Sequence, residues 1–481
     1  MTTKRLLQAG DWVAIGDNWI QADSSFTSTV EPGDHVLAVV STTTLKRISQ
    51  EVHDLVKESV GRATAAFGDL AQISDQAINQ FFSHAAELLA DDTVFAHIRS
   101  ANETDVASAV SRGRSTTRLT LSDSMRLDMI SAFEMWRDLE TGRERVLETV
   151  NHAGWTVEQI TAPLGVVGFV FEGRPNVFAD ATGVLKSGNT AVFRIGSDAL
   201  RTAHSLMTHV IRPALTKSGL PLGSVELLDS VEHAAGWALF SDGRLALAVA
   251  RGSGETVAEL GSIAQQSGIP VSLHGTGGAW LLVGSTHNSD HLSSSVEFSL
   301  DRKVCNTLNV VCVLESNAHT AVPLIVESAR RAAHHRGTQP VIRVISGSEK
   351  FFDEADISVV EELQMLSHEC EWENAPEFHI VVVASLGEAI DFFNTYSPQF
   401  VVSVISDVDE ENQLVWASSN APFVGNGFTR WVDGQFALLR PELGLSNWQS
   451  GRLFARSAIL SGDSAFSVRM RVSQNDFTVH R

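Results

Sequence analysis

The sequence predicts an α/β fold with two blocks in which helices and strands alternate. The first block runs from about residue 156 to 275, and the second from 280 to about 430. In each block, short apolar runs are separated by segments with helical periodicity. Strands that alternate with helices are joined by right-handed crossovers and form parallel sheets. We therefore expect two α/β units, each built on a parallel sheet.

A different pattern precedes the first block. Residues 1–42 read as short strands and turns, with PGD at 32–34 as a turn signal. From residue 43 to about 147, apolar residues recur at helical spacing, as in the run INQFFSHAAELLA. We expect an N-terminal extension over 1–42, followed by helices.

The elements of the two blocks follow in order along the chain. The first block predicts strands over 190–195, 224–229, 245–250 and 270–275, and helices over 177–186, 198–218, 231–240 and 254–267. The second predicts strands in WLLVGS, NVVCVLE, VIRVIS, HIVVVAS and FVVSVIS, and helices near 291–298, 319–335 and 386–394. The tail 435–481 is irregular, with a strand-like end.

Composition narrows the function classes. The chain has 57 acidic against 36 basic residues and a formal net charge of −21. Nucleic-acid and anionic membrane surfaces favour a basic protein face, so neither is an expected partner. Three cysteines do not form a disulfide framework, and no apolar run approaches the roughly 18 residues of a membrane span. We expect a cytoplasmic protein.

Glycine and histidine motifs leave two questions. RGSGETVAELG (251–261) follows a strand, but Val257 stands where a dinucleotide fingerprint has its third glycine. It is either a glycine turn that lets a phosphate approach a helix N-terminus or a plain turn. HNSDH (287–291) lacks further ligands at a useful spacing, and we predict no metal site.

Cys305 is the candidate nucleophile. Arg302 and Lys303 precede it and an apolar strand follows, so its thiolate could be stabilised by cations. The alternative is that Cys305, like Cys312 and Cys370, is a small buried side chain.

Two longer stretches and the cysteine motif resemble the γ-glutamyl phosphate reductase family, a branch of the aldehyde dehydrogenase superfamily. The first stretch is PLGVVGFVFEGRPNVFADATGVLKSGNTAVFRIGSDA (163–199), and the second is NGFTRWVDGQFALLRPELGLS (426–446). Between them, VCN (304–306) is similar to the family's nucleophile motif. The preceding residues differ, because DRKVCN stands where the family usually has QRPGVCN and is one residue shorter.

The resemblance implies an aldehyde-dehydrogenase-like fold with four parts. These are the extension 1–42, a Rossmann-like nicotinamide-cofactor domain over 43–272, a catalytic domain over 273–434 and a C-terminal segment over 435–481. Strands near 150–162 and the C-terminal tail would form an oligomerisation arm, and the chain would be a homodimer or homotetramer. The cofactor implied is NADPH rather than NAD.

The implied reaction is reduction of an acyl phosphate to an aldehyde, with L-glutamate 5-phosphate as the substrate in proline biosynthesis. Cys305 would form a thioester, because a thioester accepts hydride far better than a carboxylate does. The Cys305 backbone N–H, with the side chain of Asn176 or Asn306, would bind the oxyanion. Arg174, Arg302 and Lys303 would bind the phosphate.

Further binding roles follow from the resemblance. Thr429 and Arg430 would bind a substrate carboxylate, or Arg430 would form a structural ion pair with Asp433. Around the cofactor, the residues implied are Lys186, Arg194, Gly196, Ser197, Arg251, Gly252, Gly254 and, on the nicotinamide ribose, Glu377. Lys186 and Arg194 could instead be surface charges at the two ends of a strand.

One absence favours the reductive direction. Hydrolytic aldehyde dehydrogenases carry a water-activating glutamate where this chain reads LHGTGG, with His274. His274 is either part of the site or a core histidine. Two alternatives to the implied function remain, namely a divergent reductase or dehydrogenase of another small substrate, and an inactive binding or regulatory paralogue.

Overall fold

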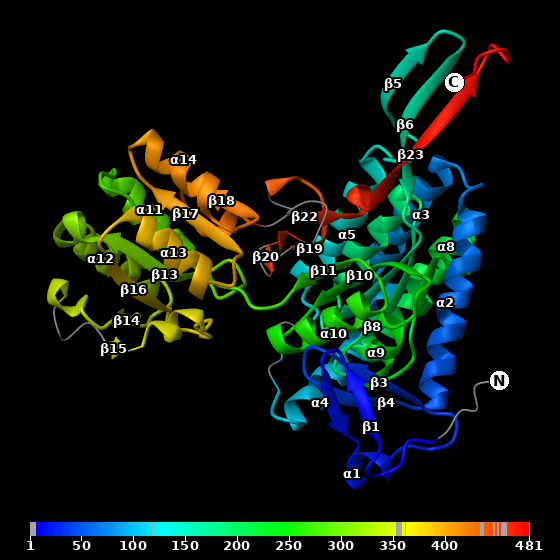
Figure 1. The fold of residues 1–481 in the computed structure, drawn as a ribbon, viewed down its shortest axis with the longest axis horizontal. Helices are drawn as coiled ribbons and strands as arrows, with labels where there is room; N and C mark the ends of the chain where they lie inside the picture. The colour runs from blue at the N-terminus through cyan, green and yellow to red at the C-terminus, as the bar shows by residue number, and fades with distance from the viewer. Residues whose placement is uncertain are drawn as a thin grey trace. The chain divides into compact units, whose positions relative to one another are not determined.

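The chain folds into two compact units, which are described separately (Figure 1). The computed structural model describes all residues except 1–5, 115, 117–118, 353–357, 361, 433–436, 446–447, 450–451, 454–458 and 481. Unit 1 comprises 1–275, 439–445 and 459–481, and unit 2 comprises 276–438 and 446–458. The first boundary falls three residues after the predicted 272, and the C-terminal segment is shared between the units.

Unit 1 is built on a five-stranded parallel sheet in the order β11-β10-β7-β8-β9. The strands are β7 (Val166–Phe171), β8 (Thr190–Ile195), β9 (Val225–Leu227), β10 (Leu245–Arg251) and β11 (Val271–His274). All six residues of both β7 and β8 are buried. Burial on both faces explains why these strands read as continuous apolar runs.

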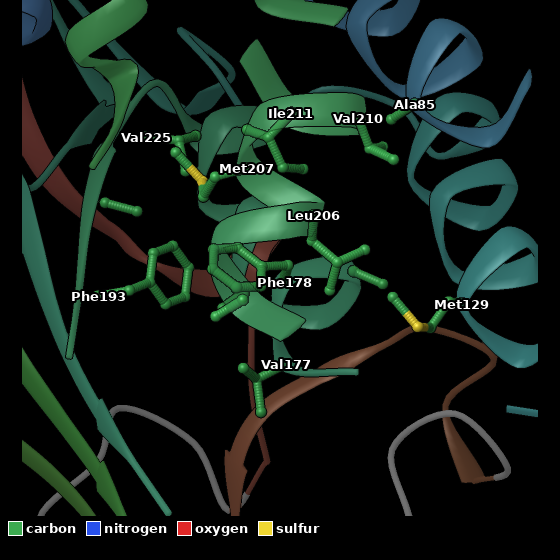
Figure 2. Close-up of a cluster of buried hydrophobic side chains, with 14 of the residues drawn as sticks. Ala85, Met129, Val177, Phe178, Phe193, Leu206, Met207, Val210, Ile211 and Val225 are labelled. Carbon is green, nitrogen blue, oxygen red and sulfur yellow. The ribbon is translucent and has the colours of Figure 1, made fainter. Parts of the chain in front are cut away.

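Helices cover the sheet of unit 1. They are α2 (Gln50–Leu70), α3 (Asp75–Ala90), α4 (Asp92–Ser111), α5 (Asp123–Asp138), α6 (Val177–Ala181), α9 (Ala234–Phe240) and α10 (Gly254–Gln266). Figure 2 shows the core between them, where Phe178 of α6 lies beside Phe193 of β8, with ring centroids 4.7 Å apart. Met129 of α5 and Leu206 extend the same cluster.

The helix predicted over 198–218 has a wider turn in its middle. It runs as α7 (Leu200–Leu206), a π-helical turn η2 (Met207–Ile211) and α8 (Arg212–Ser218). Pro213 has no N–H to donate to the preceding turn, and a π turn accommodates the missing hydrogen bond.

Smaller sheets complete unit 1. A three-stranded antiparallel sheet joins β5 (Val146–His152), β6 (Trp155–Pro163) and β23 (Phe466–Gln474), which are the segments predicted to form an arm. At the other end of the unit in Figure 1, the N-terminal residues form the hairpins β1–β2 (Trp12–Ile15, Asn18–Gln21) and β3–β4 (His35–Val39, Thr44–Ile48).

Unit 2 is built on a seven-stranded parallel sheet in the order β15-β14-β16-β13-β12-β17-β18. The strands are β12 (Ala279–Val283), β13 (Leu308–Leu314), β14 (Val341–Ile345), β15 (Ser358–Val360), β16 (Glu377–Val383), β17 (Val401–Ile405) and β18 (Phe423–Gly425). Alternate residues of β13 face opposite cores, with Val311 in one hydrophobic cluster and Val310 in the other.

Two helices cover each face of this sheet. Helices α11 (Ser289–Ser299) and α12 (Ala318–His334) pack in the cluster that contains Val311. Helices α13 (Leu386–Tyr396) and α14 (Asp409–Ser418) pack in the cluster that contains Val310. Among the described residues of the whole chain, no helix is both long and apolar enough to cross a membrane.

Candidate active site

Cys305 lies in a turn at the amino-terminal edge of the unit 2 sheet. It precedes β13 by three residues, and it is partly exposed. The Cys305 carbonyl accepts a hydrogen bond from the Gly278 N–H at 2.7 Å. A Cβ on Gly277 would lie 2.6 Å from the Cys305 Cα, so only glycine allows this approach. The nucleophile turn is therefore packed directly against the turn before β12.

Lys303 and Glu369 lie beside this turn. The Lys303 ammonium pairs with Glu369 Oε1, and both side chains are largely buried. The second oxygen of Glu369 accepts the Gly277 N–H at 2.6 Å. The predicted phosphate ligand Lys303 is thus already paired with a carboxylate, whereas Arg302 is exposed.

Asn306, Thr429 and Arg430 come together from distant parts of the sequence. The buried amide of Asn306 donates to the Val432 carbonyl at 2.6 Å and accepts from the Arg430 guanidinium. Thr429 is fully buried, and its hydroxyl donates to the Asn306 carbonyl at 2.7 Å.

Arg430 has a carboxylate partner that the sequence analysis did not name. Its Nε lies 2.7 Å from Asp301, 129 residues earlier in the chain, and its side chain is largely buried. The predicted alternative partner, Asp433, lies outside the described residues. The binding of a substrate carboxylate by Thr429 and Arg430 stays a prediction.

Glu377 begins β16 and is thus at the same sheet edge as the turn of Cys305, because β13 and β16 are parallel neighbours. Its carboxylate is 2.5 Å from the Nε of Arg343 on β14. Its contact with a ribose stays a prediction.

The other two cysteines do not resemble nucleophiles. Cys312 is buried in β13, and burial raises the pKa of its thiol. Burial also raises the pKa of Cys370 to about 12, and its Sγ lies 3.4 Å from His379 Nδ1. Burial, together with the charge of Arg343, lowers the pKa of His379 to about 4. Near neutral pH this is an uncharged pair.

In unit 1, most of the predicted cofactor residues gather at the carboxyl-terminal edge of the sheet. Gly196 follows β8, and a Cβ there would lie 3.1 Å from the Gly173 backbone nitrogen after β7. Gly252 follows β10, and a Cβ there would meet the Glu172 carboxylate at 2.6 Å. Ser197 lies in the turn after β8, and Gly254 is the first residue of α10. The strand ends therefore approach one another closely because their turns carry glycine.

Arg194 points from the end of β8 into a buried environment. Its side chain is 6% exposed, and its Nη2 donates to the Glu232 carbonyl at 3.2 Å. Its Nε has no hydrogen-bond partner, and among the described residues no carboxylate pairs with it. Burial lowers its pKa. This guanidinium is not the surface charge that the alternative interpretation required.

The carboxylate of Glu172, which follows β7, lies at the N-terminus of helix α10. Its Oε1 accepts the backbone N–H of Ser253, the N-cap residue, at 2.7 Å. The glycine turn predicted to approach a phosphate therefore has a carboxylate beside it. Nearby, Arg251 pairs with Glu442 of β19 (Glu442–Leu445) at 2.5 Å.

Arg174 and Asn176 lie just after β7, between Gly173 and α6. Both are partly exposed. Asn176 precedes the first residue of α6, and its side chain makes no capping hydrogen bond. The Asn176 side-chain amide therefore does not bond to the backbone N–H groups at the start of α6.

The structure separates Lys186 from the other predicted cofactor residues. Lys186 precedes β8, whereas Gly196 follows it, so they lie at opposite edges of the parallel sheet. Its side chain is 1% exposed, and its Nζ donates to Asn79 of α3 at 2.7 Å. We remove Lys186 from the candidate cofactor site for this reason.

His274, which the sequence analysis left open, is the last residue of β11 in unit 1. It is 8% exposed.

Sequence reasoning missed Glu369 and Glu172. Glu369 sits in the acidic run SHECEWEN, where nothing local marks it as a partner of a lysine 66 residues away. Glu172 stands in the quoted stretch EGRPN, but its contact with α10 spans 81 residues. Both contacts exist only through the tertiary fold.

With this geometry described, the chain can be compared with known proteins. The model of the aldehyde dehydrogenase family matches residues 26–344. The chain belongs to the aldehyde dehydrogenase family. We therefore assign it as an oxidoreductase that acts on an aldehyde or acyl group and uses a nicotinamide cofactor.

Individual relatives of this chain carry more specific names than the family model does. The chain is 28% identical over 413 residues to a γ-glutamyl phosphate reductase of Thermobifida fusca, with 81% of this chain and 91% of the relative covered. A reductase of the same name from Shewanella piezotolerans is 29% identical, with 80% and 89% covered.

Solved structures confirm the predicted fold. A γ-glutamyl phosphate reductase of Thermotoga maritima matches with a TM-score of 0.79 at 23% identity, covering 89% of this chain and 100% of that one. A propionaldehyde dehydrogenase of Rhodopseudomonas palustris with bound propionyl-CoA matches with a TM-score of 0.61 at 13% identity, covering 87% and 94%.

Proposed function

We propose that this chain reduces L-glutamate 5-phosphate to L-glutamate 5-semialdehyde with NADPH, through a thioester on Cys305. The observation that carries the proposal is the partly exposed Cys305 in its glycine-lined turn. The relatives named γ-glutamyl phosphate reductase support the substrate, since they match along about four-fifths of this chain.

The residues of unit 1 fit a phosphorylated nucleotide. Arg194 is a buried cation with an unsatisfied Nε, and an anionic ligand group would satisfy it. Gly196 and Gly252 let the turns that follow β7, β8 and β10 approach one another closely at the carboxyl-terminal edge of the sheet. We propose that these three residues, with Ser197 and Gly254, hold the cofactor. The cation at Arg194 favours NADP over NAD, because the former carries an additional phosphate.

The chemistry begins with the Cys305 thiolate. Its sulfur attacks the acyl carbon of the acyl phosphate, the C–O bond to phosphate breaks, and inorganic phosphate leaves as the thioester forms. When bound, the reduced nicotinamide supplies a hydride to the acyl group. The thiohemiacetal on Cys305 then collapses, so the C–S bond breaks, the aldehyde leaves and the thiolate returns.

Two sets of groups support these steps. We propose Asn176 and the Cys305 backbone N–H as oxyanion donors, because the Asn306 amide already bonds with Val432 and Arg430. We propose the exposed Arg302, with Arg174, for the leaving phosphate, because Lys303 is paired with Glu369.

Two further proposals concern the assembly and its compartment. The antiparallel sheet of β5, β6 and β23 exposes the apolar side chains Val146, Leu147, Val150, Val468, Met470 and Val472. Exposed apolar groups on an edge sheet favour association, and we propose a homo-oligomer formed through it. A thiol nucleophile must remain reduced, which fits a cytoplasmic location.

The test is phosphate-dependent reduction of NADP⁺ with glutamate 5-semialdehyde, which runs the reaction in reverse. We expect activity that requires phosphate and is absent from Cys305→Ala. Activity on other aldehydes without activity on this one would replace the substrate proposal. Failure to bind NADP⁺ or NADPH would contradict the cofactor proposal.

A further inference from the structure

We propose that Glu369 is a positioning residue for Cys305, acting by joining the nucleophile turn to the turn before β12. This inference rests on the proposed function, since it concerns how the same nucleophile is held. The contacts of Glu369 that carry the inference are those with Gly277 and Lys303.

The first step is the geometry of the two turns. Gly277 and Gly278 contact Cys305 through the backbone alone, by close packing at Gly277 and by the hydrogen bond from the Gly278 N–H. Two glycines in sequence have wide conformational freedom, and Gly278 has a φ of +105°. This turn therefore needs an external contact to stay in one conformation.

Glu369 supplies that contact with both carboxylate oxygens. One accepts the Gly277 N–H at 2.6 Å, and the other pairs with the Lys303 ammonium. Gly277 precedes the strand next to β13, and Lys303 precedes Cys305 by two residues. A single carboxylate thus connects the residue that packs under Cys305 with the chain that leads into it.

Glu369 is itself held in place by the start of β13. The side chain of Asn309 is buried, and its Nδ2 donates to the His368 carbonyl at 3.0 Å. Its Oδ1 accepts the Cys370 N–H at 2.8 Å. Hydrogen bonds on both sides of Glu369 therefore fix its backbone relative to the strand that begins just after Cys305.

The sequence of the nucleophile turn explains why an ion pair between Lys303 and Glu369 would be useful there. The residues that lead into the nucleophile, DRKV at 301–304, contain neither proline nor glycine. Proline fixes φ and reduces the freedom of a loop. In this chain, a largely buried ion pair between Lys303 and Glu369 restrains the loop instead.

The variants Glu369→Ala, Glu369→Gln and Lys303→Met separate the two contacts. Glu371, exposed and two residues further on, gives the matched control Glu371→Ala. The readouts are kcat, KM for NADP⁺, and the pH profile of Cys305 alkylation by iodoacetamide. The alkylation requires no turnover, so it still reports on positioning if the proposed substrate is wrong.

We expect Glu369→Ala to lower kcat by roughly 10- to 100-fold with KM for NADP⁺ unchanged, because a slightly misplaced nucleophile slows chemistry without affecting cofactor binding. Glu369→Gln keeps an acceptor for the Gly277 N–H and should recover most of kcat. It also leaves the Lys303 cation unpaired, so the alkylation midpoint should move to lower pH. Lys303→Met leaves the carboxylate unpaired and should move the midpoint to higher pH.

The proposal is overturned if Glu369→Ala matches Glu371→Ala in kcat and in alkylation profile. If Glu369→Ala does not fold, the opposite shifts of Glu369→Gln and Lys303→Met remain the test, and equal midpoints in those two variants overturn it. If the unmodified chain turns over the semialdehyde normally but these variants do not differ in their alkylation profiles, only the positioning role of Glu369 is refuted. If the unmodified chain does not turn over the semialdehyde, only the proposed substrate is refuted.

Discussion

Each unit has a sheet edge with candidate site residues, and the two edges use their charged residues differently. At the edge of unit 2, the buried or half-buried charges near Cys305 are paired with one another, as in Lys303 with Glu369 and Arg430 with Asp301. At the edge of unit 1, Arg251 is paired with Glu442, but Arg194 is buried with an unsatisfied Nε and no carboxylate partner among the described residues. The first arrangement supports the proposed positioning of the Cys305 turn, and the second supports the proposal that Arg194 binds an anionic cofactor group.

The largest expected effect is the loss of catalysis when the nucleophile at the edge of the unit 2 sheet is replaced. Cys305→Ala should lower kcat/KM by at least roughly a thousandfold, because no other residue replaces the nucleophile. Cys312→Ala, in the adjacent strand, is the control and should keep its turnover while losing some stability. Steady-state kinetics on both variants checks this, and full turnover in Cys305→Ala would refute the mechanism.

The next effect separates the two candidate amides. Asn176→Ala should lower kcat by about 100-fold or more, as loss of an oxyanion donor does. Asn306→Ala should instead lower the thermal unfolding temperature, because it removes a partner from the buried group of Val432 and Arg430. The reverse pattern, with Asn306 affecting kcat alone, would assign the oxyanion contact to Asn306.

Arg194 provides the direct test of the unit 1 edge. Arg194→Met should raise KM for NADP⁺ by roughly tenfold or more, since a charge-assisted contact is lost. The same variant should not destabilise the protein without cofactor, because the removed guanidinium was buried without a carboxylate partner. The control is Arg212→Met on α8, where the arginine is exposed. An unchanged KM would remove Arg194 from the cofactor site.

The last prediction concerns the dependence of stability on pH in unit 2. His379 has a folded-state pKa of about 4, below its ordinary value of 6.5, so between these values the unfolded chain binds the proton and the folded chain does not. Stability should therefore fall as pH drops through 6.5 towards 4, by about 2 kcal/mol between pH 7.5 and 5. Urea unfolding should show this loss in the unmodified chain and less of it in His379→Gln.

The sequence pattern was sufficient for most of the sheet strands. The prediction of 190–195 coincides with β8, because a strand buried on both faces gives an uninterrupted apolar run. The three-residue strands β15 and β18 were missed, whereas β9, which is equally short, lies within the predicted strand 224–229. Helix α14 was missed because acidic residues fill its first turn and only Val415 of the helix is buried.

The site was only partly predictable, for a different reason. Cys305 was named as the candidate nucleophile from its motif, which is local in sequence, and this role stays a prediction. The contacts of its neighbours were not predicted, because Glu369 pairs with Lys303 across 66 residues and Arg430 bonds to Asn306 across 124. Lys186 was misplaced because a lysine next to a strand looks alike in sequence whether the strand begins or ends there, and only the sheet shows which edge it occupies.

The central claim is that Cys305 carries the acyl group. The most direct measurement is mass spectrometry of the peptide that contains Cys305, after the chain is mixed with glutamate 5-semialdehyde and NADP⁺ without phosphate. The account predicts a glutamyl group on Cys305 that accumulates without phosphate and disappears when phosphate is added. Reduction of NADP⁺ with no adduct on Cys305, or with the adduct on another residue, would contradict it.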